Sequence, residues 1–349
     1  YQLALECIVL LKNDKNILPL AKDTRLAVIG EFAVDSRFQG MGSSHCTPTR
    51  VDHALDALRH YSSLIDYAQG YHAQATEDVL QADLIEEAIQ VASQADVVLL
   101  FVGLPEILES EGFDRETLHL PKQHVALLEA ITAIHSQVVL ILSNGGVVIL
   151  PDCIASVSGI VQGYLLGQAG GPAMVDVLFG KISPSGRLPE TMPQKAECIP
   201  SHKFFPGTRD GVEYREGLNV GYRYYNSMDD PSTNVRFPFG HGLTYTTFHY
   251  ADLRVQMIKD ESSTKRVTIS FSITNTGSTT GKEVPQCYVS PKHSSVYRPT
   301  HELKAFTKIQ LHPNESKEVT FVLEEDAFSY YDIGHKQWIV EAGKYEIQI

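Results

Sequence analysis

The chain has 349 residues, of which 43% are hydrophobic, and its net charge at pH 7 is −13. This acidic balance argues against a nucleic-acid partner and against an anionic membrane surface, because both need basic patches on the protein. The length exceeds what one ordinary hydrophobic core fills, so we expect a globular protein of two domains.

The cysteines are odd in number and have no CxxC spacing: Cys7, Cys46, Cys153, Cys198 and Cys287. This pattern argues against a disulfide framework and a zinc site, so we interpret them as reduced thiols and expect no metal and no cofactor. No apolar run approaches the roughly 18 residues of a membrane span, and the N-terminus lacks the features of a secretory signal. The sequence therefore favours a cytoplasmic location.

The first part of the chain alternates apolar runs with helical patterns. Residues 3–13 have an apolar helical pattern with no cap before it, which is typical of a fragment of a longer protein. Short apolar runs ending at glycine follow at residues 26–30, 97–103, 138–145 and 159–163 and indicate parallel strands covered on both faces. Helical patterns occupy residues 51–60, 77–93, 121–134 and 170–179. We expect an α/β sandwich, a largely parallel sheet flanked by helices, over residues 1–205.

The second part of the chain has a different pattern. Residues 203–250 are rich in aromatic residues, glycine and proline, so we expect an ordered linker at 206–245. From residue 266 to 275 apolar residues alternate with Thr and Ser, as in half-buried antiparallel strands. Further strand patterns lie at residues 284–289, 303–311, 319–323 and 345–349. They predict an all-β sandwich of the immunoglobulin or fibronectin type III kind over residues 246–349.

A polar octapeptide, LESEGFDR at residues 108–115, follows the apolar run 97–103. It presents the carboxylate of Glu111 on a loop, and Gly112 lets the backbone turn sharply next to it. A general acid fits such a position. The alternative is a solvated acidic loop in which Asp114 and Arg115 form a local ion pair.

A second candidate segment, GMGSS at residues 40–44, follows the first predicted strand of the sheet. Its glycines allow close approach to a ligand, and the hydroxyl of Ser43 can form hydrogen bonds with a polar ligand. A purely structural turn is the alternative. A phosphate-binding loop is disfavoured, because the segment has neither GxGxxG nor a Walker lysine.

Six motifs in this order carry a resemblance that covers essentially the whole chain: residues 8–20, 27–30, 40–44, 109–115, 184–189 and 237–245. Together they resemble the C-terminal part of glycoside hydrolase family 3 β-glucosidases. The resemblance implies an α/β sandwich that carries the acid/base on a loop, followed by a fibronectin type III-like domain. In that family an N-terminal TIM barrel supplies the nucleophilic aspartate, and the barrel is missing from this sequence.

The resemblance implies that Glu111 is the acid/base of a retaining β-glycosidase, with Glu109 as the second choice, and that Ser43 contacts the sugar. Retaining enzymes need a second carboxylate roughly 5 Å away, so this chain alone is expected to be inactive. The implied partners are a β-glucoside or oligosaccharide substrate and the N-terminal TIM-barrel domain of a parent protein. A non-catalytic carbohydrate-binding or scaffolding protein is the alternative, and an NAD-dependent or phosphate-binding protein is a third interpretation.

Two further residues are interpreted structurally. His241 has no nucleophile spaced near it, so we expect a turn histidine bonded to the backbone. Trp338 is the only tryptophan, and its position beside Ile339 and Val340 in a strand pattern favours a core residue over a sugar-stacking platform.

Overall fold

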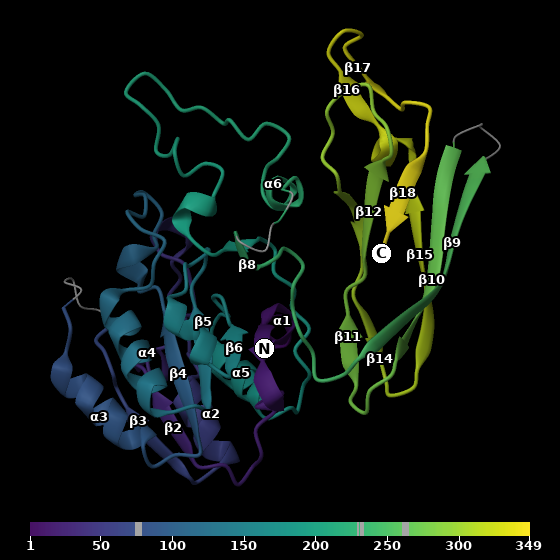
Figure 1. The fold of residues 1–349 in the computed structure, drawn as a ribbon. Helices are drawn as coiled ribbons and strands as arrows, with labels where there is room; N and C mark the ends of the chain where they lie inside the picture. The colour runs from purple at the N-terminus through teal and green to yellow at the C-terminus, as the bar shows by residue number, and fades with distance from the viewer. Residues whose placement is uncertain (74–78, 229, 231–233, 260–264) are drawn as a thin grey trace. The chain divides into compact units, whose positions relative to one another are not determined.

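The computed structural model describes residues 1–73, 79–228, 230, 234–259 and 265–349 (Figure 1). Its contacts divide the chain into two compact units. The first comprises Tyr1–Ala196 with Arg236–Tyr245, and the second comprises Glu197–Val235 with Thr246–Ile349. Residues 206–245, expected as a linker, are shared between these units, so the boundaries drawn from the sequence stay a prediction.

The first unit contains a six-stranded sheet with the order β1-β6-β5-β4-β2-β3. Its strands are β1 (Val9–Asn13), β2 (Leu26–Ile29), β3 (Ile65–Ala68), β4 (Val97–Gly103), β5 (Val138–Ser143) and β6 (Gly159–Gln162). All neighbours pair in parallel except β1, which is antiparallel to β6. Every residue of β2, β4 and β6 is buried, as continuous apolar runs in a two-sided sheet require.

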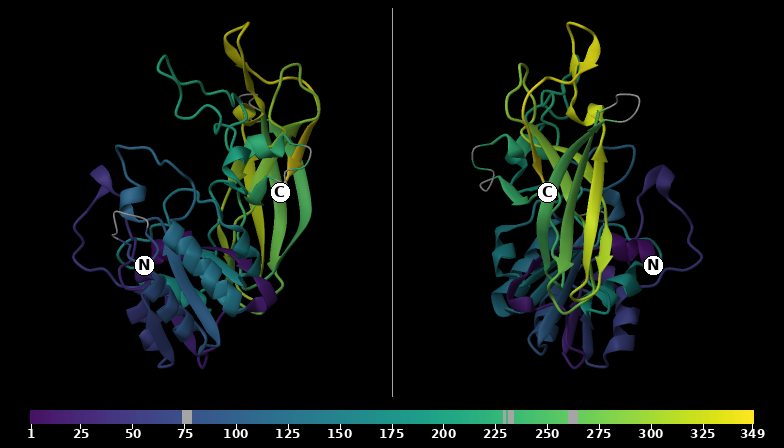
Figure 2. Two further views of the ribbon diagram at one scale, coloured as in Figure 1. Left: turned by 60° about the vertical axis from the view of Figure 1, so that its left-hand side comes forward. Right: turned by 90° about the vertical axis from the view of Figure 1, so that its right-hand side faces the viewer.

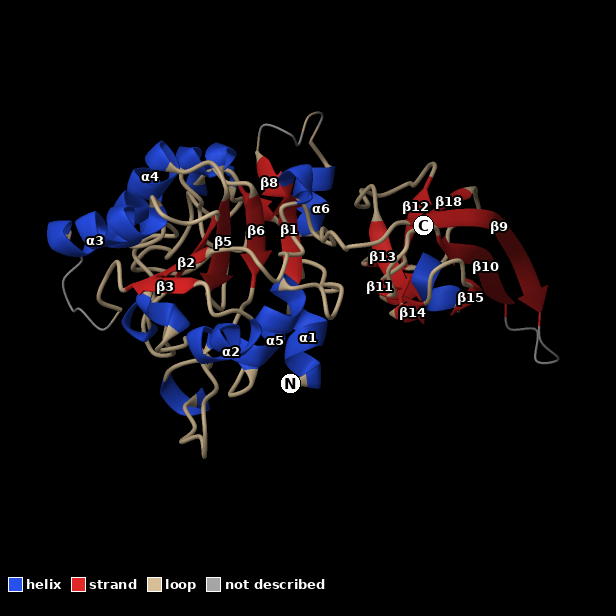
Figure 3. Ribbon diagram, turned by 90° about the horizontal axis from the view of Figure 1, so that it is seen from below, coloured by secondary structure: helices blue, strands red, loops and turns tan. Residues whose placement is uncertain are grey.

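Helices cover both faces of this sheet. Figure 3 shows α3 (Ala82–Ala92) and α4 (Lys122–Ile134) on one face, with α1 (Gln2–Cys7), α2 (Ala54–Tyr61) and α5 (Gly170–Leu178) on the other. The four helices expected between strands are therefore present with shifted ends, and Glu77 and Asp78 lie outside the described residues. This arrangement confirms the α/β sandwich.

The predicted helix over residues 3–13 is wrong in its second half. The helix α1 ends at Cys7, and the chain continues as β1, in which Val9, Leu10 and Leu11 are buried. Periodicity alone cannot separate a short apolar strand from a buried helical turn. Residues 9–13 form a strand because they pair with β6 at the edge of the sheet. The strand β3 was missed because only Ala68 in it is fully buried.

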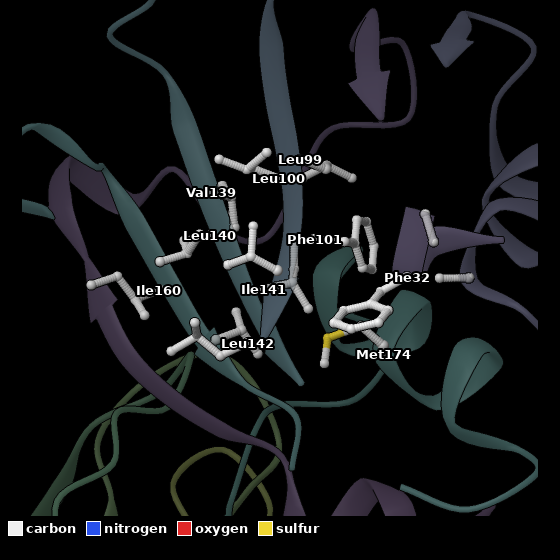
Figure 4. Packing of buried hydrophobic residues seen from close by; sticks show 14 of the residues in the cluster. Phe32, Leu99, Leu100, Phe101, Val139, Leu140, Ile141, Leu142, Ile160 and Met174 are labelled. Atoms are coloured by element: carbon white, nitrogen blue, oxygen red, sulfur yellow. The ribbon is translucent and has the colours of Figure 1, made fainter. Parts of the chain in front are cut away.

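The core of the first unit joins the sheet to the helices. Residues of β4 and β5 such as Leu100 and Leu140 are fully buried between the layers (Figure 4). On one face Phe32, from the segment after β2, packs with Met174 of α5 near Ile141. This packing holds the backbone at the carboxyl ends of β2 and β4 in place.

The second unit is all-β, with bounds as follows: β9 (Phe248–Lys259), β10 (Lys265–Asn275), β11 (Gly281–Glu283), β12 (Gln286–Pro291), β13 (Glu302–Phe306), β14 (Ile309–Leu311), β15 (Ser316–Leu323), β16 (Tyr330–Asp332), β17 (Gln337–Ile339) and β18 (Tyr345–Gln348). The sheets have the orders β15-β10-β9, β13-β12-β18, β11-β14 and β16-β17. Figure 2 shows these strands, in green and yellow, from two further sides. All of their pairs are antiparallel.

The expected alternation in this unit is confirmed. Ile269, Phe271 and Ile273 of β10 are buried and pack with Cys287 and Val289 of β12 in one cluster. Two antiparallel sheets with a shared core form the predicted β-sandwich. The strand β9 was not expected, because its sequence lacks the clear alternation of β10.

Trp338 is a correction to the sequence interpretation. It lies on β17 opposite Tyr331 of β16, and 70% of its surface is exposed. The hairpin is a sheet of only two strands, so a strand pattern there does not imply burial. The remaining elements are the strand β7 (Met192–Pro193), which belongs to the first unit, the short helix α6 (Tyr222–Asn226), which belongs to the second, and the strand β8 (Val235–Phe237), which begins at their boundary and pairs with β7.

Candidate functional site

The strand order places the two candidate segments at one point of the first unit. From β2 the chain moves outward to β3, and it then returns to add β4 on the other side of β2. The connection after β2 leads to α2 and the connection after β4 leads to α4, on opposite faces of the sheet (Figure 3). Strands related in this way open a crevice at their carboxyl ends, where α/β proteins bind ligands.

The segments 40–44 and 108–115 meet on the connections that follow these two strands. The backbone amide of Ser43 donates a hydrogen bond to Oε2 of Glu111 at 2.7 Å, across 68 residues of sequence. Both residues are exposed, so the contact leaves the carboxylate open to solvent. The structure thus brings together the two residues that the sequence singled out.

Two glycines shape this contact. Gly42 has a φ of +78°, and a Cβ built on it would lie 2.6 Å from the Cβ of Glu111 and 2.9 Å from its Oε2. The close approach of the two loops therefore requires glycine at this position. Gly112 has a φ of +96° with no neighbour near its missing Cβ, which confirms the sharp turn expected after Glu111.

Ser43 is the hydrogen-bond partner that shifts the pKa of Glu111. The hydroxyl of Ser43 and its backbone amide both lower the pKa of Glu111, because they stabilise the ionised form. Neither the neighbouring carboxylates nor Arg115 is among the causes of this shift. The contact with Ser43 therefore favours the ionised form of this carboxyl group, which accepts the hydrogen bond.

Glu109 has a different environment from Glu111, although only two residues separate them. Its Oε2 accepts a hydrogen bond from the amide of Gly145 at 2.7 Å, and its Oε1 accepts one from the amide of Gly146 at 2.6 Å. Arg37 lies 3.7 Å from the same carboxylate. Its oxygens are thus engaged by the turn after β5 and by the segment after β2.

The expected ion pair between Asp114 and Arg115 is wrong. Arg115 instead donates from Nη1 to the carbonyl oxygen of Val147 at 2.9 Å. Burial lowers its pKa, and the nearby charges of Glu109 and Glu190 raise it. The side chain of Arg115 therefore turns toward the connection after β5, away from its sequence neighbour.

His241 agrees with its structural interpretation. Its Nε2 lies 2.9 Å from the carbonyl oxygen of Leu11, and burial lowers its pKa. Sequence reasoning missed Arg37, Gly145 and Gly146 as parts of the site. The Gly-Gly pair directly after an apolar run was the signal available for the last two.

Within the part of the chain that the structure describes, no group of three His, Cys, Asp or Glu residues could hold a metal ion. No helix among these residues is both long and apolar enough to cross a membrane. The groups that meet at the site are carboxylates, backbone amides, the hydroxyl of Ser43 and the guanidinium groups of Arg37 and Arg115. Such groups transfer protons and bind polar ligands.

A three-layer α/β unit with a carboxylate at its switch point, joined to an antiparallel β-sandwich, defines the class of two-domain α/β plus all-β proteins. The family model for the glycosyl hydrolase family 3 C-terminal domain matches residues 8–245. A second model, for the fibronectin type III-like domain, matches residues 283–349. The chain belongs to glycosyl hydrolase family 3, and it corresponds to the C-terminal part of that family's proteins.

Characterised relatives cover the whole chain. It is 45% identical over 351 residues to the thermostable beta-glucosidase B of Acetivibrio thermocellus, covering 100% of this chain and 46% of that protein. It is 44% identical over 360 residues to the exo-alpha-(1->6)-L-arabinopyranosidase of Bifidobacterium longum, with the same two coverages. The chain thus spans about half the length of these relatives.

Solved structures show the same correspondence. The GH3 beta-glucosidase of Bifidobacterium adolescentis has a TM-score of 0.92 and 46% identity, over 99% of this chain and 50% of its own. The beta-glucosidase of Kluyveromyces marxianus has a TM-score of 0.90 and 25% identity, over 99% of this chain and 58% of its own. The resemblance drawn from the six motifs is confirmed.

Proposed function

We propose that this chain contributes the general acid/base carboxylate, Glu111, of a retaining β-glycosidase that hydrolyses terminal β-glycosidic bonds. The observation that carries the proposal is the exposed carboxylate of Glu111, bonded to the Ser43 amide at the switch point of the sheet. The nucleophile would come from an N-terminal TIM-barrel domain of a parent protein, because the chain spans about half of its relatives. The proposed substrate is a β-glucoside or oligosaccharide.

The reaction needs Glu111 in both of its protonation states. In the first step the carboxylic acid protonates the glycosidic oxygen while a second carboxylate attacks the anomeric carbon. In the second step the ionised carboxylate removes a proton from the water that releases the sugar. In this proposal the hydroxyl of Ser43, which is exposed next to Glu111, hydrogen-bonds the sugar.

The contact with Ser43 favours the second of these states. It lowers the pKa of Glu111, whereas a general acid must carry a proton near neutral pH. A second carboxylate roughly 5 Å away would raise that pKa by repulsion between like charges. The proposal therefore assigns to the barrel both the nucleophile and the charge that makes Glu111 an acid.

The test compares Glu111→Gln with Glu109→Gln in a protein that contains both the barrel and this chain. We expect Glu111→Gln to lower kcat/KM strongly for substrates with poor leaving groups and little for activated aryl glycosides, which depart without a proton. Azide should restore turnover of activated substrates by Glu111→Gln and release a β-glycosyl azide of retained configuration. Azide rescue of Glu109→Gln alone would transfer the acid/base role to Glu109, and rescue of neither would remove it from this loop.

A non-catalytic carbohydrate-binding role is the second candidate, and the exposed pair Trp338 and Tyr331 favours it. Their rings lie 5.7 Å apart in an edge-to-face arrangement on the hairpin β16–β17. Exposed aromatic faces can stack on sugar rings. Retention of the chain by immobilised β-glucan, lost on Trp338→Ala, would support this role, and equal elution of the two proteins would contradict it.

We also propose a cytoplasmic location for the protein. All five cysteines are free in the structure, which suits a reducing compartment. Fractionation of the source cells tests this proposal, and recovery of the protein outside the cytoplasm would contradict it.

A further inference from the structure

Three connections of the sheet meet at the side chain of Glu109. The residue itself lies on the connection after β4, directly after the 3-10 turn Glu106–Leu108. Its carboxylate accepts amide hydrogen bonds at 2.7 and 2.6 Å from Gly145 and Gly146, on the connection after β5. Arg37, on the connection after β2, lies 3.7 Å away. No other carboxylate among the described residues of this site joins all three connections.

Arg37 ties the connection after β2, on which it lies, to the backbone of the connection after β4. Its Nε donates to the carbonyl oxygen of Leu104 at 3.1 Å, and its Nη2 donates to that of Glu109 at 3.3 Å. Only 2% of its side chain is exposed, and its second acidic neighbour, Glu106, lies 3.8 Å away. Burial lowers the pKa of Arg37, while the charges of Glu106 and Glu109 raise it. Removal of Glu109 would leave this buried cation with Glu106 as its one remaining acidic neighbour among these residues, at a cost in stability.

The carboxylate of Glu109 also faces Arg115 and Glu190. Burial raises the pKa of Glu190, and the negative charge of Glu109 raises it further, whereas Arg115 lowers it. Glu109 is thus surrounded by two guanidinium groups, two backbone amides and one further acid. The two amides and the two guanidinium groups attract the carboxylate of Glu109 and hold the backbone that continues, two residues later, to Glu111, whereas Glu190 repels it.

Glu111 itself has far less support. Among the residues that the structure describes, Ser43 alone hydrogen-bonds its carboxylate, through its backbone amide and its hydroxyl, and the side chain of Glu111 is exposed. The position of its carboxylate therefore depends on the position of the loop backbone. A displacement of about 1 Å of a catalytic group can cost roughly 100-fold in rate.

We propose that Glu109 is a positioning residue, which fixes the loop of Glu111 to the turn after β5 through the amides of Gly145 and Gly146 and to the segment after β2 through Arg37. This inference rests on the proposed function of Glu111. Glu109 does not touch substrate in this role, and it acts on the reaction only through the place it gives to Glu111.

The experiment measures kcat/KM against leaving-group ability in a protein that contains both the barrel and this chain. Glu109→Gln keeps the size of the side chain but replaces one acceptor oxygen with an NH2 group that cannot accept a backbone amide. We expect kcat/KM for poor leaving groups to fall roughly 100-fold and that for activated aryl glycosides to change little, because misplacement impairs protonation of the leaving group. KM should change little.

Glu106→Gln is the matched control. It removes the same charge from the same loop and the same partner, Arg37, but Glu106 accepts no amide from the turn after β5. We expect its leaving-group dependence to equal that of the unmodified protein. An equal loss of kcat/KM in both variants would overturn the proposal. The negative charge near Arg37, and not the hydrogen bonds from the amides of Gly145 and Gly146 to Glu109, would then be responsible.

A second pair of variants protects the test against a folding defect in Glu109→Gln. A Cβ on Gly145 would lie 3.2 Å from both carboxylate oxygens of Glu109, so Gly145→Ala must displace them slightly, whereas a Cβ on Gly146 would make only an ordinary contact at 3.5 Å. Gly145→Ala should show the leaving-group dependence of Glu109→Gln in weaker form, and Gly146→Ala should not show it.

The outcomes separate this inference from the proposed function. A loss that is uniform over all leaving groups, accompanied by a lower Tm, would show that Glu109 only supports the fold and would overturn the positioning role. If Glu111→Gln in the same assay shows no leaving-group dependence and no azide rescue, the proposed acid/base role of Glu111 is contradicted, and the positioning role of Glu109 is contradicted with it. If Glu111→Gln behaves as an acid/base variant while Glu109→Gln and Gly145→Ala behave normally, only the positioning role fails.

Discussion

Glu109 and Glu111 are two residues apart on one loop, yet their carboxylates are held in opposite ways. Glu109 is half-buried and accepts hydrogen bonds from two backbone amides of the turn after β5. Glu111 is exposed and accepts one amide hydrogen bond, from Ser43. The first carboxylate is suited to hold the loop, and the second is free to exchange protons with a ligand.

The isolated chain should not hydrolyse an aryl β-glucoside. One carboxylate can protonate a leaving group but cannot also form the covalent glycosyl intermediate. Release of the aryl alcohol from an activated β-glucoside by the purified chain measures this. Turnover that disappears in the Glu111→Gln variant of the same chain would contradict the prediction, whereas turnover unchanged by that substitution would indicate a contaminant.

Ser43→Ala should raise the pKa of Glu111 part of the way back to its ordinary value. The substitution removes the hydroxyl, which lowers the pKa of Glu111, but keeps the backbone amide at 2.7 Å. The midpoint of a carboxyl titration followed by 13C NMR in the isolated chain measures the change. Ser44→Ala is the control, because the hydroxyl of Ser44 donates to the carbonyl oxygen of Met41. An unchanged midpoint in Ser43→Ala would show that the backbone amide alone lowers the pKa of Glu111.

Gly42→Ala should disturb the contact between the two loops, whereas Gly112→Ala should not. A Cβ at position 42 would lie 2.6 Å from the Cβ of Glu111, and nothing lies within 4 Å of one at position 112. Both residues have positive φ, so each substitution should also cost about 1 kcal/mol of stability from backbone strain. In a protein with its barrel, we expect only Gly42→Ala to lose activity beyond what its Tm explains. Equal activities at equal Tm would refute the importance of this close approach.

Asp176→Asn should destabilise the first unit at neutral pH. The buried carboxylate of Asp176 accepts hydrogen bonds from the hydroxyls of Tyr1 and Tyr61 and lies 2.9 Å from Nζ of Lys181. Burial alone would raise its pKa, but these partners together lower it. Loss of this charged hydrogen-bonding group should cost on the order of 2 kcal/mol in the free energy of unfolding at pH 7.

The pH dependence of this effect has a definite sign. Because the pKa of Asp176 is lower in the folded than in the unfolded state, its stabilisation is complete above the unfolded value of about 3.9 and is lost as the pH falls through the folded value. Urea unfolding at several pH values should therefore show a difference between the two proteins that is constant above about pH 5 and shrinks below about pH 4. Asp56→Asn, at an exposed ion pair with Arg59, should change stability by less than about 1 kcal/mol. A difference that grew on acidification would contradict the sign.

The sequence by itself determined those strands whose pattern of apolar residues shows how they are buried. The runs that became β2, β4, β5 and β6 are apolar without alternation, so they could only be covered on both faces. The alternation of β10 likewise determined a half-buried antiparallel strand. Hydrophobic pattern reports how deeply a segment is buried, and for these segments that was sufficient.

Only the tertiary structure decided which distant residues meet. Residues 9–13 became a strand because β6 offered a free edge, and Trp338 became exposed because its hairpin has no third strand. The contact of Ser43 with Glu111 follows from β2 and β4 being neighbours at the switch point, which no local pattern states. For the same reason the sequence could name Glu109 and Glu111 as candidates but could not show that the turn after β5 engages one of them and leaves the other free.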